Sequence, residues 1–199
     1  MPRNGTQKSL YRAQEIYLLA AQLFVEKGVG STSLADIAKA LNITKAGLYY
    51  YFESKQDLLY RIVELGLDNV KDEVLDPARE IKDAEERLKF IILNHSRLAA
   101  EGNHAVIIVS HEMNSLSFTQ REAALKRRRE YFDFVRATLI ELEKQEKLND
   151  VDLTTATFTL FGMILWLSRW YRPGGKLSVE KVCEDVCEMA LKGLLRSSS

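Results

Sequence analysis

The sequence predicts an all-α protein. An N-terminal three-helix domain with a helix-turn-helix is expected to precede a C-terminal helical bundle, with about nine helices in all. Apolar residues recur every three or four positions through most of the chain, which is the period of a helix with one buried face. No segment shows the apolar-polar alternation of a half-buried strand. Residues 33–59 read as a short helix, a tight turn, a second short helix and the start of a third.

The helix-turn-helix is the best-defined of these elements. Its first helix opens at Ser33 and ends before Asn42, a residue type that tolerates the left-handed backbone conformation of a tight turn. Thr44 can cap the second helix, because its hydroxyl accepts a hydrogen bond from an unpaired backbone N–H. Leu48 is the apolar anchor of that second helix. Two short helices joined this closely are how a helix-turn-helix presents its second helix to the major groove of DNA.

The remaining helices follow from apolar periodicity and from capping residues. Residues 11–27 form an amphipathic first helix, with Gly28 at the position of a helix C-cap. Ser54 is expected to cap a fourth helix that runs toward Val74 and is stopped by Pro77. Further helices are expected over residues 84–100, 105–113, 120–147, 153–171 and 178–194.

Length and charge restrict the classes of protein that need to be considered. The chain has 199 residues and no net charge, enough for one or two domains with a substantial core. It contains no apolar run of membrane-spanning length and no secretion signal, so we expect a cytoplasmic protein with no membrane partner. Residues 1–55 carry seven Lys and Arg against four Asp and Glu. A mildly basic head on an acidic body suits contact with phosphates at one end only.

The helix expected over residues 153–171 is apolar on almost every side, and such a helix must be covered all round. A single chain of this length has too few other helices to cover every side of this one. We therefore expect this helix and the last one to pair with their copies in a two-fold four-helix bundle; a central helix in a monomer is the alternative. The interface of the expected homodimer is assigned to Leu165, Trp170, Val182, Val186 and Ala190.

Residues 48–52 read Leu-Tyr-Tyr-Tyr-Phe and are followed by Ser54-Lys55 and Leu58-Leu59, with Phe24-x-x-x-Gly28 and Ser33-x-x-x-Ile37-Ala38 upstream. This composite resembles the tetracycline-repressor (TetR/AcrR) family of bacterial transcription regulators. The rest of the chain resembles the family only in length and helical pattern. The resemblance implies a helix-turn-helix DNA-binding domain over residues 1–53 and a ligand-binding and dimerisation domain over residues 54–199. A dimer of this kind reads a near-palindromic operator.

By match to the family motif, the resemblance assigns contacts with double-stranded DNA. The residues assigned to the groove are Lys45, Ala46, Gly47 and Tyr49. Those assigned to phosphates are Thr44, Tyr50, Tyr51 and Lys55, and Ser33 is included at the start of the preceding helix. Gly47 stands where the family often has Thr, and Ala35 where some members have a base-reading Arg. We therefore expect the base specificity to differ from theirs.

The resemblance also implies a repressor that leaves its operator when a small molecule binds in the body. A cluster of aromatic residues with Met suits a large apolar ligand. The stretch that begins at Trp166 and continues as Arg169-Trp170-Tyr171-Arg172-Pro173-Gly174-Gly175 resembles members that sense acyl-CoA thioesters. Cations for such a ligand are available in residues 126–129. The expected ligand-binding residues are Met113, Phe118, Phe132, Arg136, Phe158, Phe161 and Trp166, with His95 or Asn114 as further candidates.

Two other interpretations stay open at this point. One is a DNA-binding regulator with no small-molecule effector. The other is a metal protein, because Glu101-x-x-His104 is half of the di-iron carboxylate pattern of helical bundles, and His104 with His111 is a candidate regulatory metal pair. No nucleophile elbow, phosphate loop or dinucleotide fingerprint is present. We therefore expect a regulator and not an enzyme, with no catalytic residue, metal or cofactor.

The two cysteines, Cys183 and Cys187, lie four residues apart on one expected helix. Such a pair is poorly placed to bridge itself. We expect both side chains to fill an apolar seam, with a redox switch or an intersubunit disulfide as the alternative.

Overall fold

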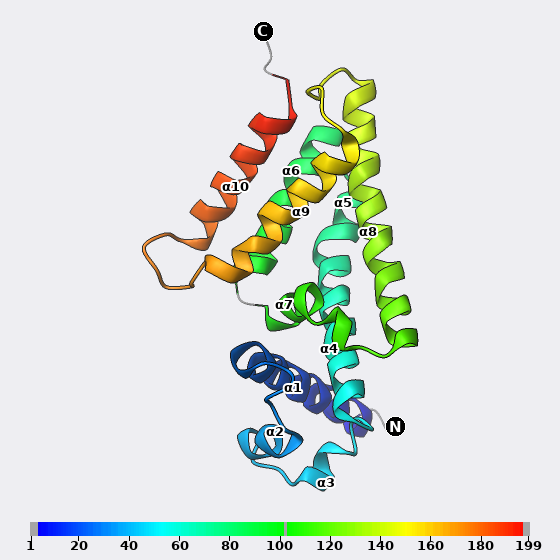
Figure 1. Cartoon of the computed structure of the whole chain (residues 1–199), viewed down its shortest axis with the longest axis vertical. Helices are drawn as coiled ribbons and strands as arrows, with labels where there is room; N and C mark the ends of the chain where they lie inside the picture. The colour runs from blue at the N-terminus through cyan, green and yellow to red at the C-terminus, as the bar shows by residue number, and fades with distance from the viewer. Residues whose placement is uncertain (1–3, 102, 197–199) are drawn as a thin grey trace. The chain divides into compact units, whose positions relative to one another are not determined.

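The computed structural model describes residues 4–101 and 103–196. Within these residues every regular element is a helix (Figure 1), so the all-α prediction is confirmed. None of the described helices is long and apolar enough to cross a membrane. The chain divides into two compact units, Met1–Gly66 with His104–Ala124 and Leu67–Asn103 with Leu125–Ser199. Whether the functional domains divide at residues 53 and 54 stays a prediction.

The first unit is built around a long N-terminal helix. Helix α1 packs on α2 and on α7, and α2 packs on α3. The core between them contains fully buried Ile16, Phe24, Ile37 and Leu48. Its elements are α1 (Asn4–Lys27), α2 (Leu34–Ala40), α3 (Lys45–Leu48), the start of α4 (Lys55–Val70), α7 (His104–His111), the 3-10 turn η2 (Met113–Ser115) and the beginning of α8 (Phe118–Lys144).

A glycine allows α4 and α7 to approach almost backbone to backbone. A Cβ atom added to Gly66 would lie 2.5 Å from the carbonyl oxygen of Ala105 and 2.7 Å from a methyl carbon of Val109. Glycine in a helix interior costs about 1 kcal/mol relative to alanine. Its presence in the middle of α4 is therefore explained by this contact.

In the second unit, α4 does not end where the sequence suggested. The helix passes into a π-helical turn, η1 (Lys71–Leu75), and then directly into α5 (Asp76–Arg79). Pro77 lies in the first turn of α5, directly after this wider turn. The wider turn is closed by a hydrogen bond from the N–H of Asp76 to the carbonyl of Lys71. The expectation that Pro77 stops the helix was therefore wrong.

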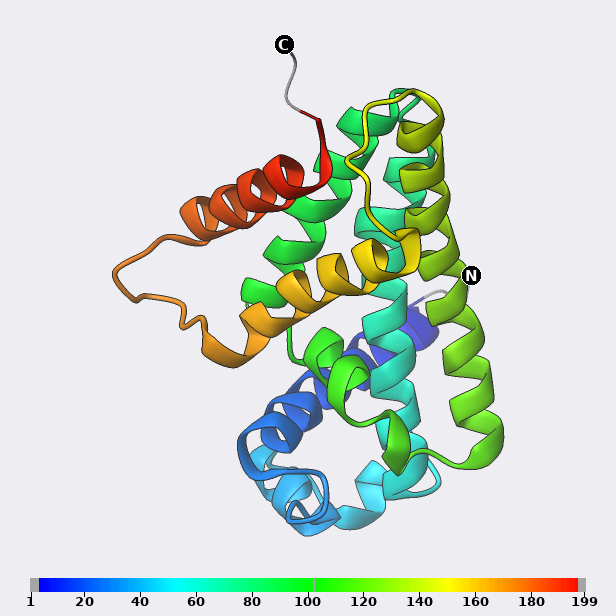
Figure 2. The ribbon, with the colours of Figure 1, turned by 45° about the horizontal axis from the view of Figure 1, so that its top comes forward.

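The second unit also contains most of α8 and three further helices. They are α6 (Ala84–Ala100), α9 (Leu153–Trp170) and α10 (Val179–Leu194). Each begins at a side chain that accepts a hydrogen bond from a free backbone N–H: Asp83, Asp152 and Ser178 respectively. Helix α6 packs along both α9 and α10, and Figure 2 shows the same three helices from a second direction.

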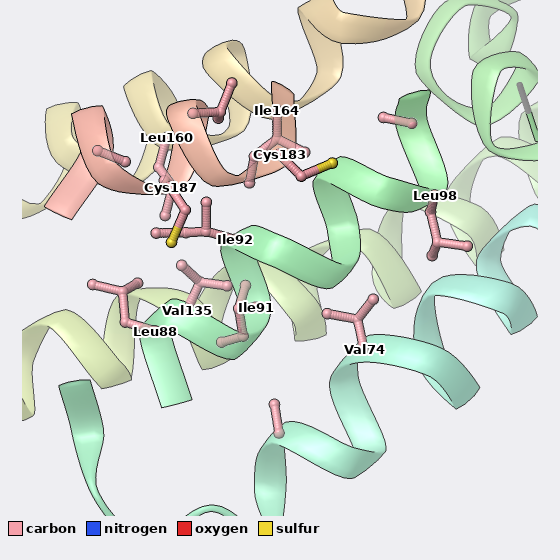
Figure 3. Close-up of a cluster of buried hydrophobic side chains, with 14 of the residues drawn as sticks. Val74, Leu88, Ile91, Ile92, Leu98, Val135, Leu160, Ile164, Cys183 and Cys187 are labelled. Carbon is pink, nitrogen blue, oxygen red and sulfur yellow. The ribbon is translucent and has the colours of Figure 1, made fainter. Parts of the chain in front are cut away.

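The core of the second unit is one cluster of buried apolar side chains (Figure 3). Ile92 of α6, Leu160 of α9 and Cys187 of α10 belong to it. Cys183 is also in this cluster, and both thiols are free and buried. Burial raises the pKa of Cys183 to about 11, so its thiol stays protonated near neutral pH. The prediction that the cysteines fill an apolar seam is confirmed.

Candidate DNA interface and effector site

The start of α2 is fixed by a reciprocal pair of hydrogen bonds. The backbone N–H of Asp36 donates to Ser33 Oγ over 3.1 Å, and the N–H of Ser33 donates to Asp36 Oδ2 over 2.8 Å. The Ser33 hydroxyl also donates to that carboxylate, at 2.6 Å. Hydrogen bonds from the Ser33 side chain and backbone hold the pKa of Asp36 below its usual value. The carboxylate therefore stays charged beside the helix N-terminus, where negative charge is favourable.

The turn between α2 and α3 has the geometry that the sequence predicted. Asn42 has a φ of 53°, in the left-handed region. The next residue, Ile43, is tied to the end of α2, because its N–H donates to the carbonyl of Ala38 over 3.0 Å. Thr44 then caps α3, with its Oγ1 accepting from the N–H of Gly47 over 3.1 Å. These contacts hold a helix of only four residues in a defined direction.

One side of the segment formed by α3 and the residues after it is buried, and the other side faces solvent. Leu48 is completely buried and Phe52 nearly so. In contrast, Tyr49 is 48% exposed and Tyr50 is 78% exposed. Tyr49 and Tyr50 are therefore accessible to a binding partner, although the helix that precedes them is anchored by buried side chains. Of the other residues assigned to DNA, Ser33, Thr44, Lys45 and Ala46 are exposed, and Gly47, Tyr51 and Lys55 are partly buried.

Lys55 is held at the head of α4. Ser54 caps this helix by accepting from the N–H of Asp57 over 3.0 Å, and the Asp57 carboxylate accepts from the N–H of Glu53, also at 3.0 Å. The ammonium of Lys55 donates to the carbonyl of Gly30 over 3.4 Å. The cation is thus held against the loop between α1 and α2, beside a helix N-terminus that favours anions.

The second unit contains a connected group of aromatic rings, which we call the ring cluster: His95, Tyr131, Phe132, Phe158 and Phe161. Phe132 of α8 has its ring centroid 4.7 Å from that of Phe158 and 6.1 Å from that of Phe161, both on α9. Phe161 is 5.4 Å from Tyr131 and 6.0 Å from His95. Three of the residues expected to bind a ligand are therefore brought together.

His95 and Tyr131 form the buried end of the ring cluster. They are 4% and 7% exposed, and the Tyr131 hydroxyl lies 3.2 Å from His95 Nδ1, within hydrogen-bonding distance. Burial lowers the pKa of His95 to about 4 and raises the pKa of Tyr131 far above its usual value. Both groups are therefore uncharged at neutral pH.

The other residues expected to bind a ligand are more scattered. Arg136 lies partly buried on α8, one helical turn beyond Phe132, and Trp166 of α9 is largely exposed. Met113 is buried and Phe118 is largely exposed, and both belong to the first unit. The ligand-binding role of all seven stays a prediction.

The residues assigned to a dimer interface fall into two groups. Val182, Val186 and Ala190 are buried within the chain, in the core of the second unit, so a partner chain would find little of them to contact. Leu165 is partly buried and Trp170 is half exposed. The apolar surface that α9 and α10 leave uncovered consists instead of Phe158, Trp166, Trp170 and Met189.

Sequence reasoning missed two features of these sites. It named His95 as a further candidate for the ligand site but did not predict that Tyr131 lies beside it. The contact at Gly66 was also missed, although an isolated glycine in a helical pattern is itself a signal of close approach. For the metal alternative, the described residues contain no group of three or more His, Cys, Asp or Glu side chains suited to hold an ion.

Comparison with known proteins identifies the family. Residues 16–62 match the bacterial regulatory proteins of the tetR family, and residues 82–194 match the tetracyclin repressor-like C-terminal domain. The HTH-type transcriptional repressor KstR2 of Mycolicibacterium smegmatis is 30% identical over 94% of this chain and 92% of its own.

Two solved structures resemble the whole fold. AibR in complex with isovaleryl coenzyme A and operator DNA is 32% identical, with a TM-score of 0.84 over 89% of this chain and 97% of its own. KstR2 of Mycobacterium tuberculosis, a ketosteroid transcriptional regulator, is 25% identical, with a TM-score of 0.86 over 94% of this chain and 96% of its own. The chain therefore belongs to the TetR family and is a DNA-binding transcriptional regulator rather than an enzyme.

Proposed function

We propose that the chain is a repressor that binds a near-palindromic operator as a homodimer and is released when a large apolar effector, an acyl-CoA thioester, binds to the second unit. The observation that carries the DNA-binding part is the exposure of Tyr49 and Tyr50 at the C-terminal end of a capped helix whose Leu48 is fully buried. In this arrangement the groove-facing set is Lys45, Ala46, Gly47 and Tyr49, and the phosphate-facing set is Ser33, Thr44, Tyr50, Tyr51 and Lys55.

The homodimer follows from the uncovered apolar surface of α9 and α10. Trp166 and Trp170 of α9 and Met189 of α10 are large apolar side chains left exposed in the single chain. Pairing of these helices with their copies would bury them and would place two α3 helices on one face of the DNA. A charge introduced at Trp166 is expected to weaken the dimer, as measured by light scattering.

The effector class is supported by the ring cluster and by the relatives. Phe132, Phe158 and Phe161 offer an apolar surface, and Arg136 lies one turn along α8 from Phe132. AibR has been solved with isovaleryl coenzyme A and operator DNA. An effector that binds the DNA-incompetent state more tightly by about 1–3 kcal/mol would lower operator affinity by about 5–150-fold.

The test is binding of the purified protein to DNA from its own upstream region, at fixed salt, with and without a panel of acyl-CoAs. Release by one acyl-CoA supports the repressor and its effector class together. Binding that no acyl-CoA changes would keep the DNA-binding function and remove the effector class. It would favour a regulator that responds to a partner or to nothing.

Variants of the DNA surface test the assignment of α3 and α4. Tyr49→Ala and Lys55→Ala are each expected to weaken operator binding while the dimer stays intact. If Lys55 contacts a phosphate, its removal also lowers the slope of log affinity against log salt by about one. Lys144→Ala, at an exposed lysine of the second unit, is the matched control. Unchanged affinity in both variants would contradict this DNA interface.

A further inference from the structure

The buried end of the ring cluster contains the polar atoms of His95 and Tyr131, at positions that apolar side chains could fill equally well. His95 lies on the inward face of α6, whose neighbouring positions Leu88, Ile91 and Ile92 are all fully buried and apolar. Its ring is surrounded by those of Tyr131 and Phe161. A buried polar group costs free energy for each hydrogen bond that it lacks, and the hydrogen bond between His95 and Tyr131 offsets only part of that cost.

The His95–Tyr131 pair has one more hydrogen-bond donor than it uses internally. A neutral imidazole carries one N–H, and the phenol carries one O–H. The one hydrogen bond that joins them within the described residues runs between Tyr131 Oη and His95 Nδ1. If the phenol donates, His95 keeps an Nε2–H; if the imidazole donates, Tyr131 keeps its O–H. In either tautomer one donor is left to offer to another molecule.

The ring cluster also connects this pair to the surface. Phe158 is 63% exposed, and its ring packs on Phe132, which packs on Phe161. Phe161 then packs against both His95 and Tyr131. Rings on α8 and α9 thus form an unbroken apolar series from an accessible side chain to the buried donor.

We infer that the His95–Tyr131 pair selects effectors that carry an uncharged oxygen, a ketone or a hydroxyl, in the part of the molecule that is buried among the rings. This inference rests on the proposed function, because it concerns the same effector. The oxygen accepts the hydrogen bond that the pair has left over. An effector with a plain methylene at this point leaves the donor unpaired.

The His95–Tyr131 pair is also expected to exclude charged groups from the ring cluster. Both groups are uncharged near neutral pH, because burial opposes the charged form of each. They therefore offer nothing to compensate a buried carboxylate or phosphate, whose transfer from water is costly. The charged part of an acyl-CoA must stay outside the ring cluster, and the recognised oxygen must lie in the distal half of the acyl chain.

The experiment compares matched effectors on the intact protein bound to its operator. The probes are saturated acyl-CoAs of short, medium and long chain, each paired with the same chain carrying a ketone or hydroxyl in its distal half. The measured quantity is the concentration that releases half of the DNA. For the wild type, at least one oxygenated probe is expected to act at a concentration about tenfold or more below that of its saturated partner.

Variants then assign that preference to the pair. Tyr131→Phe removes the hydroxyl and keeps the ring, and the double variant His95→Phe with Tyr131→Phe removes both polar groups, which costs less than leaving one unpaired. Tyr171→Phe is the matched control, because it deletes a buried hydroxyl that donates to the carbonyl of Leu177 over 3.1 Å, outside the ring cluster. We expect the preference to vanish in the double variant and to persist in Tyr171→Phe.

Each outcome decides the inference. Equal release by every oxygenated probe and its saturated partner would overturn it while leaving the acyl-CoA effector in place. A preference that survives in the double variant would overturn it too, since the oxygen would then be read elsewhere. If no acyl-CoA of either kind releases the DNA, the proposed effector class is wrong and the inference falls with it.

Discussion

The two units of the molecule expose their candidate functional residues in opposite ways. In the first unit, Tyr49 and Tyr50 face solvent directly after a four-residue helix that is held in place by buried Leu48. In the second unit, His95 and Tyr131 are themselves buried, within a ring cluster that joins the main core. One site is a surface supported by a core, and the other is part of a core.

This difference determines what a mutation does in each unit. An exposed side chain of the first site such as Tyr50 can be removed without disturbing the core, because most of its atoms touch water. A side chain of the second site contributes to stability and to any ligand contact at once. Function and stability should therefore separate cleanly in the first unit and remain linked in the second.

The largest expected effect is the loss of a core side chain in the second unit. Ile92→Ala removes a fully buried side chain of the cluster in Figure 3 and should lower the free energy of unfolding by about 2–5 kcal/mol. Tyr50→Ala, at a largely exposed position of the first unit, should change it by less than about 0.5 kcal/mol while weakening operator binding. Urea denaturation of both variants checks this, and equal destabilisation would contradict the separation.

The next effect is a pH dependence that belongs to the second site. Below about pH 6.5 the unfolded chain binds a proton at His95, whereas the folded chain does so only near pH 4, because burial lowers the pKa of this group to about 4. The unfolded state thus binds more protons in this window, and stability falls as the pH drops through it. The loss attributable to His95 should reach about 3 kcal/mol, measured by denaturation at a series of pH values.

Two controls isolate this contribution. The pKa of His104 is also lowered by burial, so His104→Gln should remove its smaller share of the same slope. The carboxyls with lowered pKa include Glu180 and Glu188, whose ordinary value is 4.5. They lose their contribution only below about pH 5.5, which leaves the range from pH 7 to about 5.5 free of them. A slope in that range that is unchanged in the His95→Phe and Tyr131→Phe double variant would contradict the assignment.

The contrast between the units also explains what the sequence could predict. The helix-turn-helix was readable because its geometry requires particular residue types at fixed places: Ser33 and Thr44 as caps, and Asn42 at a positive φ. The family match adds the rest of the motif. For the second unit, apolar periodicity predicted the helices and which of their faces are buried, because this periodicity is a local property of the chain.

What the sequence could not predict depends on partners far along the chain. His95 and Tyr131 are 36 residues apart, and neither residue type signals that the two meet. Val182, Val186 and Ala190 have the spacing of an interface helix, and the same spacing serves equally to pack α10 on α6 within one chain. Pro77 does not end the helix as the sequence predicted, because a π-helical turn directly before it accommodates the proline.

A smaller effect tests whether backbone contact is special to the first unit. Gly66→Ala places a methyl group 2.5 Å from the Ala105 carbonyl oxygen and should destabilise the fold by about 1–3 kcal/mol. Gly162→Ala, on α9 with nothing within 4 Å of the new methyl, should instead stabilise it by up to about 1 kcal/mol. Thermal denaturation should therefore show shifts of opposite sign, and a Gly66→Ala variant that loses no stability would show that α4 and α7 can separate at little cost.

The smallest effect concerns the cap of α3. Thr44→Ala deletes the oxygen that accepts from the Gly47 N–H and should cost about 1 kcal/mol, as lost N-caps do. Thr44→Ser keeps the hydroxyl and should restore most of this stability. Because Thr44 is also assigned to a phosphate, the measurement is made on the free protein, without DNA. If Thr44→Ala and Thr44→Ser melt at the wild-type temperature, α3 is held by Leu48 alone, and the first unit relies on its core as fully as the second does.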